Sequence, residues 1–450
     1  MIVKDLLDKY SAAVPRYTSY PTAPHFHSGV DCGKYSQWLS TLSAGQSISI
    51  YIHIPYCDRL CWFCACHTRH TLKYGPIKTY LEALFVEIEQ VGARVSAESK
   101  VVEVHLGGGS PTMLRPEDMV ALMAHLRAHF SFAEAVELSV EMDPNDLDEG
   151  RFDALAAIGL TRASLGVQDF DPVVQKTINR IQTFEQTKSV VEAVRARGVT
   201  SVNCDILYGL PHQTVETLQN TVRDILSLAP DRVALFGYAH VPWMKKHQTM
   251  IAEDALPGVG QRFEQMSRAA SMLVDAGYQA IGIDHFALPD DSMATAAREG
   301  RLRRNFQGYT TDAADALIGL GASSISQLPQ GYVQNMAATG EYQRMVKQGG
   351  LAAVRGIALS TDDRARAAVI EQIMCDFGFS FAELRRAFPQ DAELIITEAK
   401  VFAGGDRDGL CSIEQDYFAL TRVGRTFARS VAAVFDCYLS NGKARHSIAV

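Results

Sequence analysis

The chain has 450 residues, of which 47% are hydrophobic and 21% are charged, and its formal net charge is −8. This length allows two or three domains with the composition of a soluble globular protein, and the acidic balance argues against extensive binding to nucleic acid or to an anionic membrane. The first thirty residues hold no apolar signal-peptide core, and no apolar run is long enough to span a membrane, so we expect a cytoplasmic protein.

Residues 1–46 precede the first predicted core strand and are expected to form an N-terminal arm. Within them, residues 15–22 contain two prolines and little periodicity, which is typical of an ordered loop or an extended arm. This segment is rich in tyrosine and hydroxyl groups. It therefore either packs on the rest of the molecule or forms a surface arm without a chemical role.

From residue 47 onward, β-rich apolar runs alternate with helical stretches, which is typical of β/α units. Near-continuous apolar strands fit a parallel sheet covered on both faces, and six units are fewer than the eight of a closed barrel. We therefore expect an α/β fold with a partial (β/α)6 barrel over residues 47–350, and an open doubly wound sheet is the alternative. The predicted strands are 47–54, 101–106, 136–140, 163–167, 201–207 and 232–238, and the predicted helices are 80–95, 183–197, 214–228 and 260–275.

The pattern changes after residue 280. Residues 280–350 contain short apolar stretches that we interpret as loops and turns, and residues 351–450 are predicted to form a separate, mainly helical domain. Helices at 381–388 and 392–402, a hairpin at 409–421 and a closing helix at 423–439 resemble a winged-helix-like arrangement. Acidic surroundings argue against DNA binding by this domain.

Three cysteines follow the first strand, with three and then two residues between Cys57, Cys61 and Cys64. Three closely spaced thiolates can bind three corners of a cubane iron–sulfur cluster and leave the fourth iron open to a ligand that is not protein. The alternative is a structural zinc site, for which His67 and His70 are close enough in sequence to be further ligands. However, no second cysteine or histidine pair follows at zinc-binding spacing.

Polar or glycine-rich groups follow the predicted strands, at the ends where barrel enzymes carry their chemistry. Taken singly, each is more often a turn or a helix cap. Their coincidence at one edge of the sheet predicts the mouth of an active site. The groups are the glycines 107–109, Glu141, Gln168, Arg180, Asp205 and the segment 239–242.

The cysteine motif after a strand, Phe63 and the glycines 107–109 resemble the radical S-adenosylmethionine superfamily. Nearly the whole chain is similar to one of its families, the oxygen-independent coproporphyrinogen III oxidases, or dehydrogenases. The chain departs from the family at Ile181, where an acidic residue is more common, and at Ser110, where threonine is usual. The similar segments are 15–22, 51–55, 166–170, 205–211, 238–240, 284–287 and 304–311, together with Cys66.

The resemblance implies a [4Fe–4S] cluster as metal site on Cys57, Cys61 and Cys64, and a catalytic role for Cys66, which does not ligate the cluster. It also implies two molecules of S-adenosylmethionine. The positions matching contacts to the molecule on the open iron are Tyr51, Gly108, Glu141 and Ile325. Those matching contacts to the second molecule are Phe63, Gly109, Ser110, Gln168, Arg180, Asp205 and Ala239.

The activity that the resemblance implies is the anaerobic oxidative decarboxylation of the ring A and B propionates of coproporphyrinogen III, through a 5′-deoxyadenosyl radical. The product is protoporphyrinogen IX, in haem biosynthesis. We expect a monomer that receives electrons from a cellular one-electron donor and contacts neither nucleic acid nor membrane. The substrate carboxylates require basic partners, and the N-terminal arm is a candidate lid over them. The candidate partners are Arg16, Arg59, Arg301, Arg303 and Arg304.

Three other functions are compatible with parts of the pattern. They are a radical-SAM-type haem chaperone, a haem-degrading radical SAM enzyme and a zinc-stabilised binding protein. Cys66 and the segment 15–22 favour the oxidase, because the chaperones typically have an aromatic residue at the cysteine position and lack the arm.

Overall fold

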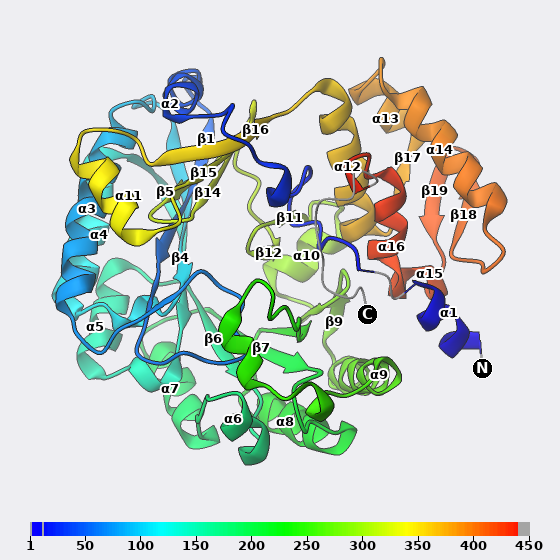
Figure 1. Cartoon of the computed structure of the whole chain (residues 1–450), viewed down its shortest axis with the longest axis horizontal. Helices are drawn as coiled ribbons and strands as arrows, with labels where there is room; N and C mark the ends of the chain where they lie inside the picture. The colour runs from blue at the N-terminus through cyan, green and yellow to red at the C-terminus, as the bar shows by residue number, and fades with distance from the viewer. Residues whose placement is uncertain (1, 11–12, 440–450) are drawn as a thin grey trace.

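The computed structural model describes residues 2–10 and 13–439 (Figure 1). Its centre is a 12-stranded sheet in the order β16-β15-β14-β13-β1-β4-β5-β6-β7-β8-β10-β9. Six of these strands pair in parallel, one with the next, which confirms the predicted partial (β/α)6 barrel. They are β1 (Ser47–Ile54), β4 (Lys100–Gly108), β5 (Ser131–Met142), β6 (Arg162–Gln168), β7 (Ser201–Tyr208) and β8 (Arg232–Gly237).

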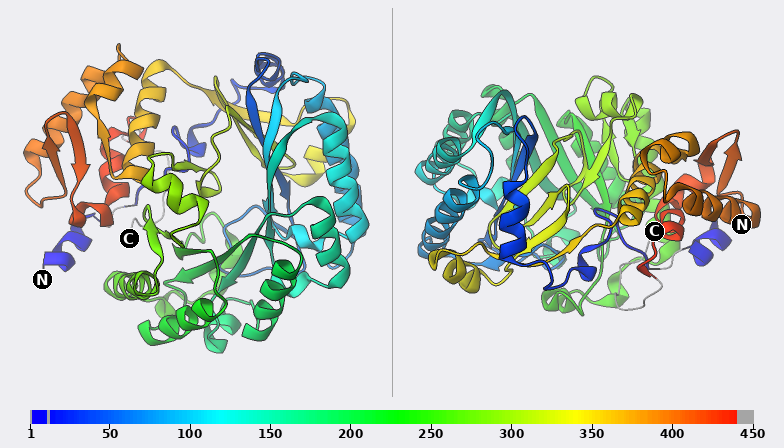
Figure 2. Two further views of the ribbon diagram at one scale, coloured as in Figure 1. Left: turned by 180° about the vertical axis from the view of Figure 1, so that it is seen from behind. Right: turned by 90° about the horizontal axis from the view of Figure 1, so that it is seen from above.

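Helices on the outer side of the curved sheet cover these strands, as Figure 2 shows. The capping box predicted at Thr183 and Gln186 opens α7, where each side chain bonds the other residue's backbone. None of the helices in the described ranges is long and apolar enough to cross a membrane. The helices are α3 (Gly75–Gly92), α4 (Pro116–His129), α5 (Glu149–Ile158), α6 (Pro172–Thr177), α7 (Phe184–Ala196), α8 (Val215–Ser227) and α9 (Val259–Asp275).

The prediction that residues 280–350 contain only loops and turns is wrong. Strand β13 pairs in parallel with the free edge of β1, and antiparallel strands continue the sheet to β16, which lies past residue 350, where the sequence predicts a domain boundary. These strands are three to six residues long, too short for an alternating pattern to stand out. The added elements are β9 (Gln279–Ile281), β10 (His285–Ala287), α10 (Ser292–Arg298), β11 (Arg303–Asn305), β12 (Gly308–Thr310), β13 (Ala316–Leu320), β14 (Ile325–Leu328), β15 (Gly331–Asn335), α11 (Thr339–Lys347) and β16 (Ala353–Ala358).

The C-terminal part combines helices with a three-stranded sheet of order β17-β19-β18. The predicted continuous helix over 423–439 is wrong, because the chain leaves helical geometry at Phe427 (φ −108°, ψ 23°), whose side chain is buried in the local core. Residues 440–450 of the predicted domain lie outside the described residues. The elements are α12 (Thr361–Asp376), β17 (Gly378–Ser380), α13 (Phe381–Ala387), α14 (Ala392–Gly405), β18 (Cys411–Glu414), β19 (Tyr417–Leu420), α15 (Arg422–Thr426), α16 (Ala428–Ala432) and the 3-10 turn Ala433–Phe435.

The N-terminal segment connects the two parts of the molecule. Helix α1 (Ile2–Tyr10) lies beside the C-terminal helices (Figure 1), and its Leu6 and Leu7 join their apolar core together with Tyr17 and Tyr20. Helix α2 (Cys32–Ser40), in contrast, contributes to the core beneath the large sheet. The arm thus packs on the molecule rather than extending from it.

Candidate active site

The cysteine loop begins directly after β1, where strand β2 (Tyr56–Cys57) pairs in parallel with β3 (Arg69–His70). Side chains from two other loops hold its backbone. Asn179 donates a hydrogen bond to a loop carbonyl at 2.9 Å, and the His247 Nε2 atom lies 2.7 Å from the carbonyl oxygen of Cys64. The thiols are therefore presented at the C-terminal ends of the parallel strands, as the sequence predicts.

A cubane and a single zinc ion require different spacings of their thiolate ligands. A single zinc ion with bonds of about 2.3 Å holds its sulfur ligands about 3.8 Å apart, whereas a cubane binds each thiolate at a separate iron. In the described ranges, the side chains with donor atoms all within 4.8 Å of one another form two groups, and the three cysteines are not such a group. In the described ranges, the three thiols therefore do not form a preformed site for a single zinc ion, whereas a cubane does not require them to lie so close together. The two groups are Glu89 with His125 and His129, and Asp58 with Asp143 and Asp146.

The surroundings of the thiols control their protonation. Burial, with the neighbouring thiols adding to it, raises the pKa of Cys57 well above its usual range. Burial also raises the pKa of Cys61, but the Arg180 guanidinium, 3.7 Å from the sulfur, opposes this. Hydrogen bonds from Cys66 lower the pKa of Cys64 to about 7. Because thiols bind metal as thiolates, a buried cation beside Cys61 favours the ligating form.

The three glycines after β4 allow close approach to the cysteine loop. A Cβ atom on Gly107 would lie 2.8 Å from the carboxylate of Glu141, and one on Gly109 would lie 2.5 Å from the carbonyl oxygen of Tyr56. Gly108 adopts a φ of +112°, a backbone conformation that residues with a Cβ atom rarely adopt. Beyond the glycines, the Ser110 hydroxyl donates to Asp146 at 2.5 Å.

Glu141 is the second-last residue of β5 and lies next to the glycines. The Gly108 N–H donates to it at 2.9 Å, and the Nε2 atom of His105 lies 3.3 Å from its other oxygen. Burial would raise the pKa of Glu141, but the hydrogen bonds from His105 and Gly108 lower it overall. The carboxylate is therefore ionised at neutral pH and suited to an ammonium group or a hydroxyl donor. Tyr51 stacks on His105, with ring centroids 5.7 Å apart.

Arg180 and Asp205 come from the following units of the barrel. Arg180 is buried and donates to Asp143 at 2.9 Å and to the carbonyl of Gly166 at 2.5 Å, so Asp143 forms an ion pair with this cation. Burial raises the pKa of Asp205 to about 6. Gln168, two residues after Gly166, is the last residue of β6 and has a φ of +70°.

The remaining predicted contacts lie around this centre. Ile325 begins β14, and its carbonyl lies 2.6 Å from where a Cβ atom of Gly319 would be; Gly319 pairs with Tyr51 in the sheet. Phe63 and Ala239 meet through Gln248, whose amide donates to both carbonyls. Cys66 is exposed on the loop, and the Lys245 ammonium donates to its carbonyl at 2.8 Å.

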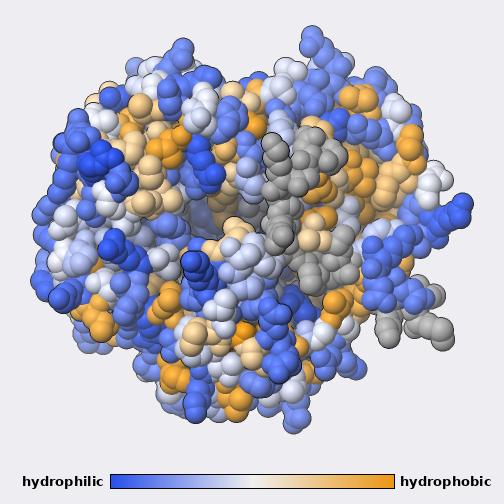
Figure 3. All heavy atoms as spheres, in the orientation of Figure 1, coloured by the Kyte–Doolittle hydropathy of each residue, from blue (hydrophilic) through white to orange (hydrophobic). Residues whose placement is uncertain are grey.

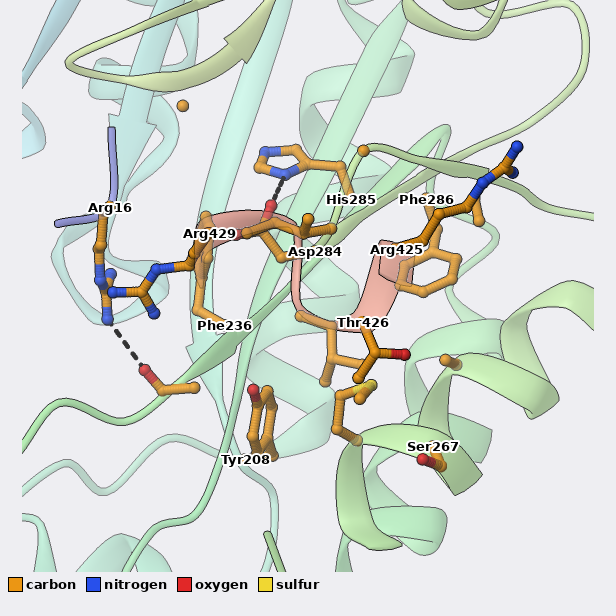
Figure 4. Close-up of a pocket in the computed structure, with 18 of the residues that line it drawn as sticks. Arg16, Tyr208, Phe236, Ser267, Asp284, His285, Phe286, Arg425, Thr426 and Arg429 are labelled. Carbon is orange, nitrogen blue, oxygen red and sulfur yellow. Dashed lines mark hydrogen bonds and ion pairs between the residues drawn. The ribbon is translucent and has the colours of Figure 1, made fainter. Parts of the chain in front are cut away.

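Two adjoining cavities open from these residues. A smaller one of about 170 Å³ is lined by Glu141 and Asp205 among others. A larger one of about 660 Å³ lies between the barrel, the β11–β12 hairpin and helices α15 and α16, and the face in Figure 3 is hollowed near its centre. Figure 4 shows Phe236, Tyr208 and Phe286 in the larger cavity. The two cavities share Phe236, His285 and Gln307 as walls.

Of the five arginines predicted as candidate partners of the substrate carboxylates, three lie beside acidic side chains and two line the larger cavity. Arg59 pairs with its neighbour Asp58, Arg301 pairs with Glu299, and Arg303 lies 3.6 Å from Glu371. In contrast, Arg16 and Arg304 line the larger cavity. Sequence reasoning missed four further arginines there, because nothing in their local sequence marks them. They are Arg262, Arg422, Arg425 and Arg429.

Models of known protein families match both the barrel part and the C-terminal part of the chain. Residues 51–225 match the radical SAM superfamily, and residues 359–427 match the HemN C-terminal domain. The oxygen-independent coproporphyrinogen III oxidase of Bradyrhizobium diazoefficiens is 47% identical over 97% of both chains. That of Paracoccus denitrificans is 46% identical over 96% of both chains.

A solved structure is similar over nearly the whole molecule. It is coproporphyrinogen III oxidase (HemN) from Escherichia coli, described as a radical SAM enzyme, with a TM-score of 0.90 and 37% sequence identity. The match covers 94% of this chain and 97% of the other.

Proposed function

The chain belongs to the oxygen-independent coproporphyrinogen III oxidase family, and we propose that it converts coproporphyrinogen III to protoporphyrinogen IX without oxygen, in haem biosynthesis. One observation carries the proposal. The three thiols follow β1 at the mouth of the barrel, where Glu141 is held ionised and lines the smaller cavity, and that cavity adjoins one of about 660 Å³ that is rich in arginine. This volume lies within the range of ligand pockets.

Cys57, Cys61 and Cys64 would hold a [4Fe–4S] cluster, with S-adenosylmethionine at its open iron. When bound, these groups supply a carbon radical that removes a hydrogen atom from an unactivated carbon. Glu141 would accept hydrogen bonds from the ammonium or ribose of S-adenosylmethionine, since its carboxylate is held ionised. Arg180 would balance the negative charge of the Cys61 thiolate.

We also propose a second S-adenosylmethionine molecule. Its predicted contacts lie on the loop after β1, on or after strands β4, β6, β7 and β8, and in the loop after α6. They are Phe63, Gly109, Ser110, Gln168, Asp205, Ala239 and Arg180. Asp205 accepts a hydrogen bond from Asn203 at 2.8 Å, and a carboxylate of this kind suits the hydroxyls of a ribose. We further propose that the enzyme acts as a monomer.

In the proposed reaction, each propionate side chain becomes a vinyl group. The side chain loses one hydrogen atom from its β-carbon, then one electron to a cellular acceptor, and its carboxylate leaves as CO₂. Two such rounds, on rings A and B, give the product. A cellular one-electron donor supplies the electron that starts each round. The thiol of Cys66, on the cysteine loop, would act in this chemistry without ligating iron.

The test uses protein purified without oxygen. Iron and sulfide are measured first, and reductant, S-adenosylmethionine and coproporphyrinogen III are then supplied. Protoporphyrin fluorescence after oxidation of the product supports the proposal. Haem binding without turnover would assign the chain to the haem chaperones instead, and zinc without sulfide would indicate a zinc-stabilised binding protein.

A further inference from the structure

Three side chains with metal-binding atoms lie together on helices α3 and α4, outside the active site. His125 and His129 are four residues apart, so they share one face of α4, and Glu89 comes from the neighbouring helix α3. Their donor atoms all lie within 4.8 Å of one another. Figures 1 and 2 show the two helices side by side on the outer side of the sheet. The proposed reaction gives these side chains no role.

The group lies at the end of the barrel opposite its mouth. In β/α units each helix returns the chain to the edge of the sheet where the next parallel strand begins. Glu89 is in the last turn of α3, and the two histidines are in the last two turns of α4. In barrel enzymes this end serves stability rather than chemistry. A metal ion bound here would therefore connect two helices and would not meet the substrate.

The backbones of the two helices are in close contact beside the group. A Cβ atom on Gly92 would lie 2.7 Å from the carbonyl oxygen of His129, so a larger residue would displace α4. The ring of His125 lies against two others, with its centroid 4.7 Å from that of Phe85 and 4.6 Å from that of His129. These contacts restrict the ligands before any ion binds, which lowers the entropic cost of binding.

The spacing of two of the donors fits a tetrahedral ion. Zinc binds imidazole nitrogen and carboxylate oxygen at about 2.0–2.2 Å, which places two ligands of a tetrahedral site about 3.4 Å apart. The Nε2 atom of His125 lies 3.3 Å from a carboxylate oxygen of Glu89. It also lies 3.1 Å from the carbonyl oxygen of Phe85, which can only accept a hydrogen bond. This nitrogen therefore carries a proton, which a metal ion would replace and release to solvent.

Glu89 is accessible to a cation from solvent. Its side chain is 51% exposed, and among the described residues it lies beside His125 while no lysine or arginine forms an ion pair with it. Exposure also leaves room for water as a further ligand. The other group of close donor atoms in the described ranges differs, because it consists of carboxylates alone and two of the three already pair with arginines.

We propose that Glu89, His125 and His129 bind a divalent transition-metal ion of the zinc type, with water as the remaining ligand, and that the ion joins α3 to α4. Two imidazoles and one carboxylate are the protein ligands of known zinc sites. Nitrogen donors disfavour Mg²⁺ and Ca²⁺, which prefer oxygen. The site is independent of the cluster and of the proposed reaction. An ion there would stabilise the helices that follow β1 and β4.

Zinc binding to the anaerobically purified, cluster-containing protein tests this proposal. Equilibrium dialysis against ZnCl₂ measures zinc per chain, and the wild type is expected to bind one ion more than His129→Gln or Glu89→Gln. Both variants change exposed side chains, so both should fold. Loss of a group that only supports a metal ligand typically lowers affinity 10- to 100-fold, and loss of a ligand itself should lower it at least as much.

Matched controls keep all three ligands. Glu82→Gln on α3, Glu117→Gln on α4 and His27→Gln on the arm change exposed side chains of the same kinds, and all three are expected to bind zinc as the wild type does. Zinc held by the cysteine loop would be equal in every protein and cancels in the comparison. A failure of the proposed function therefore leaves this test intact.

Stability gives a second measurement. Zinc at 100 times its dissociation constant should lower the unfolding constant of the wild type about 100-fold, seen as a higher urea midpoint, and should leave the midpoint of His129→Gln unchanged. Equal zinc binding by the wild type and both ligand variants would overturn the proposal, and so would equal stabilisation by zinc. Displacement of the zinc by a tenfold excess of Mg²⁺ would exclude the nitrogen ligands.

Discussion

At the scale of single residues, the cysteine loop contains two kinds of thiol. Cys57, Cys61 and Cys64 lie at the ends of the parallel strands with buried or half-buried side chains, whereas Cys66 is exposed. Replacing any of the first three by alanine is expected to abolish bound iron and sulfide. Cys66→Ser should keep both at wild-type levels and lower turnover. Loss of iron in the Cys66→Ser protein would make Cys66 a ligand and contradict the open iron.

Gly109 gives a second test at this scale. Because a Cβ atom there would lie 2.5 Å from the carbonyl oxygen of Tyr56, Gly109→Ala must displace the backbone next to Cys57. We expect a destabilisation of about 1–3 kcal/mol and weaker binding of S-adenosylmethionine, measured by urea unfolding and equilibrium dialysis. Gly260→Ala is the control, because a Cβ atom there meets nothing within 4 Å. Equal behaviour of the two variants would show that the close approach is unimportant.

At the scale of elements, the sequence predicts the helices and strands whose apolar pattern extends over many residues or whose ends carry a capping signal. Strand β1 is an eight-residue apolar run, and the capping box at Thr183 marks where α7 begins. Strand β13 has only five residues, all buried, so neither its length nor an alternating pattern distinguishes it from an apolar loop. The break in the helix at Phe427 depends on the packing of that side chain in the C-terminal core. Local helix propensity does not report such packing, so the sequence did not predict the break.

Glu87 joins three of these elements. It is 1% exposed on α3 and accepts hydrogen bonds from Gly321 after β13, Asn335 on β15 and Tyr342 on α11, at 2.7, 2.7 and 2.6 Å. Burial raises the pKa of Glu87 to about 7 from an ordinary value of 4.5. Between these pH values the folded protein binds more protons than the unfolded chain, so this group lowers stability as pH rises, by about 3 kcal/mol in all.

Glu87→Gln should remove this pH dependence, since an amide does not ionise. The measurement is the urea midpoint from pH 5 to pH 8, in which the wild type should lose more stability than the variant as pH rises. Glu82→Gln, on the same helix but 57% exposed, is the control and should follow the wild type. Parallel curves for the wild type and Glu87→Gln would refute the expected titration.

At the scale of the whole molecule, the site has one part that chain order predicts and one part that depends on packing between distant segments. The cofactor residues follow one barrel strand after another, so their order in the sequence predicts that they meet at one edge. The arginines that line the larger cavity include residues of the N-terminal arm, the β11–β12 hairpin and helix α16. These elements lie close together because the C-terminal part packs against the barrel. Local sequence therefore could not separate Arg304 from its neighbours Arg301 and Arg303.

The arm is where these two parts of the molecule are joined, and its removal tests the arrangement. The deletion must end before α2, because Tyr35 and Leu39 belong to the core beneath the sheet. Deleting residues 1–21 removes Arg16 and uncovers the C-terminal core where Leu6 and Leu7 pack, at a cost of about 1.5–3 kcal/mol for each buried side chain lost.

We expect this truncated protein to keep wild-type iron and sulfide, because in the described ranges the bonds that hold the cysteine loop come from Asn179, His247 and β3, which the deletion leaves in place. Turnover and coproporphyrin affinity should fall, and limited proteolysis should cleave residues 359–439 faster. Arg16→Gln in the full chain separates the causes, because it removes the charge and leaves the packing intact. Unchanged turnover after the deletion would show that the arm has no role over the cavity.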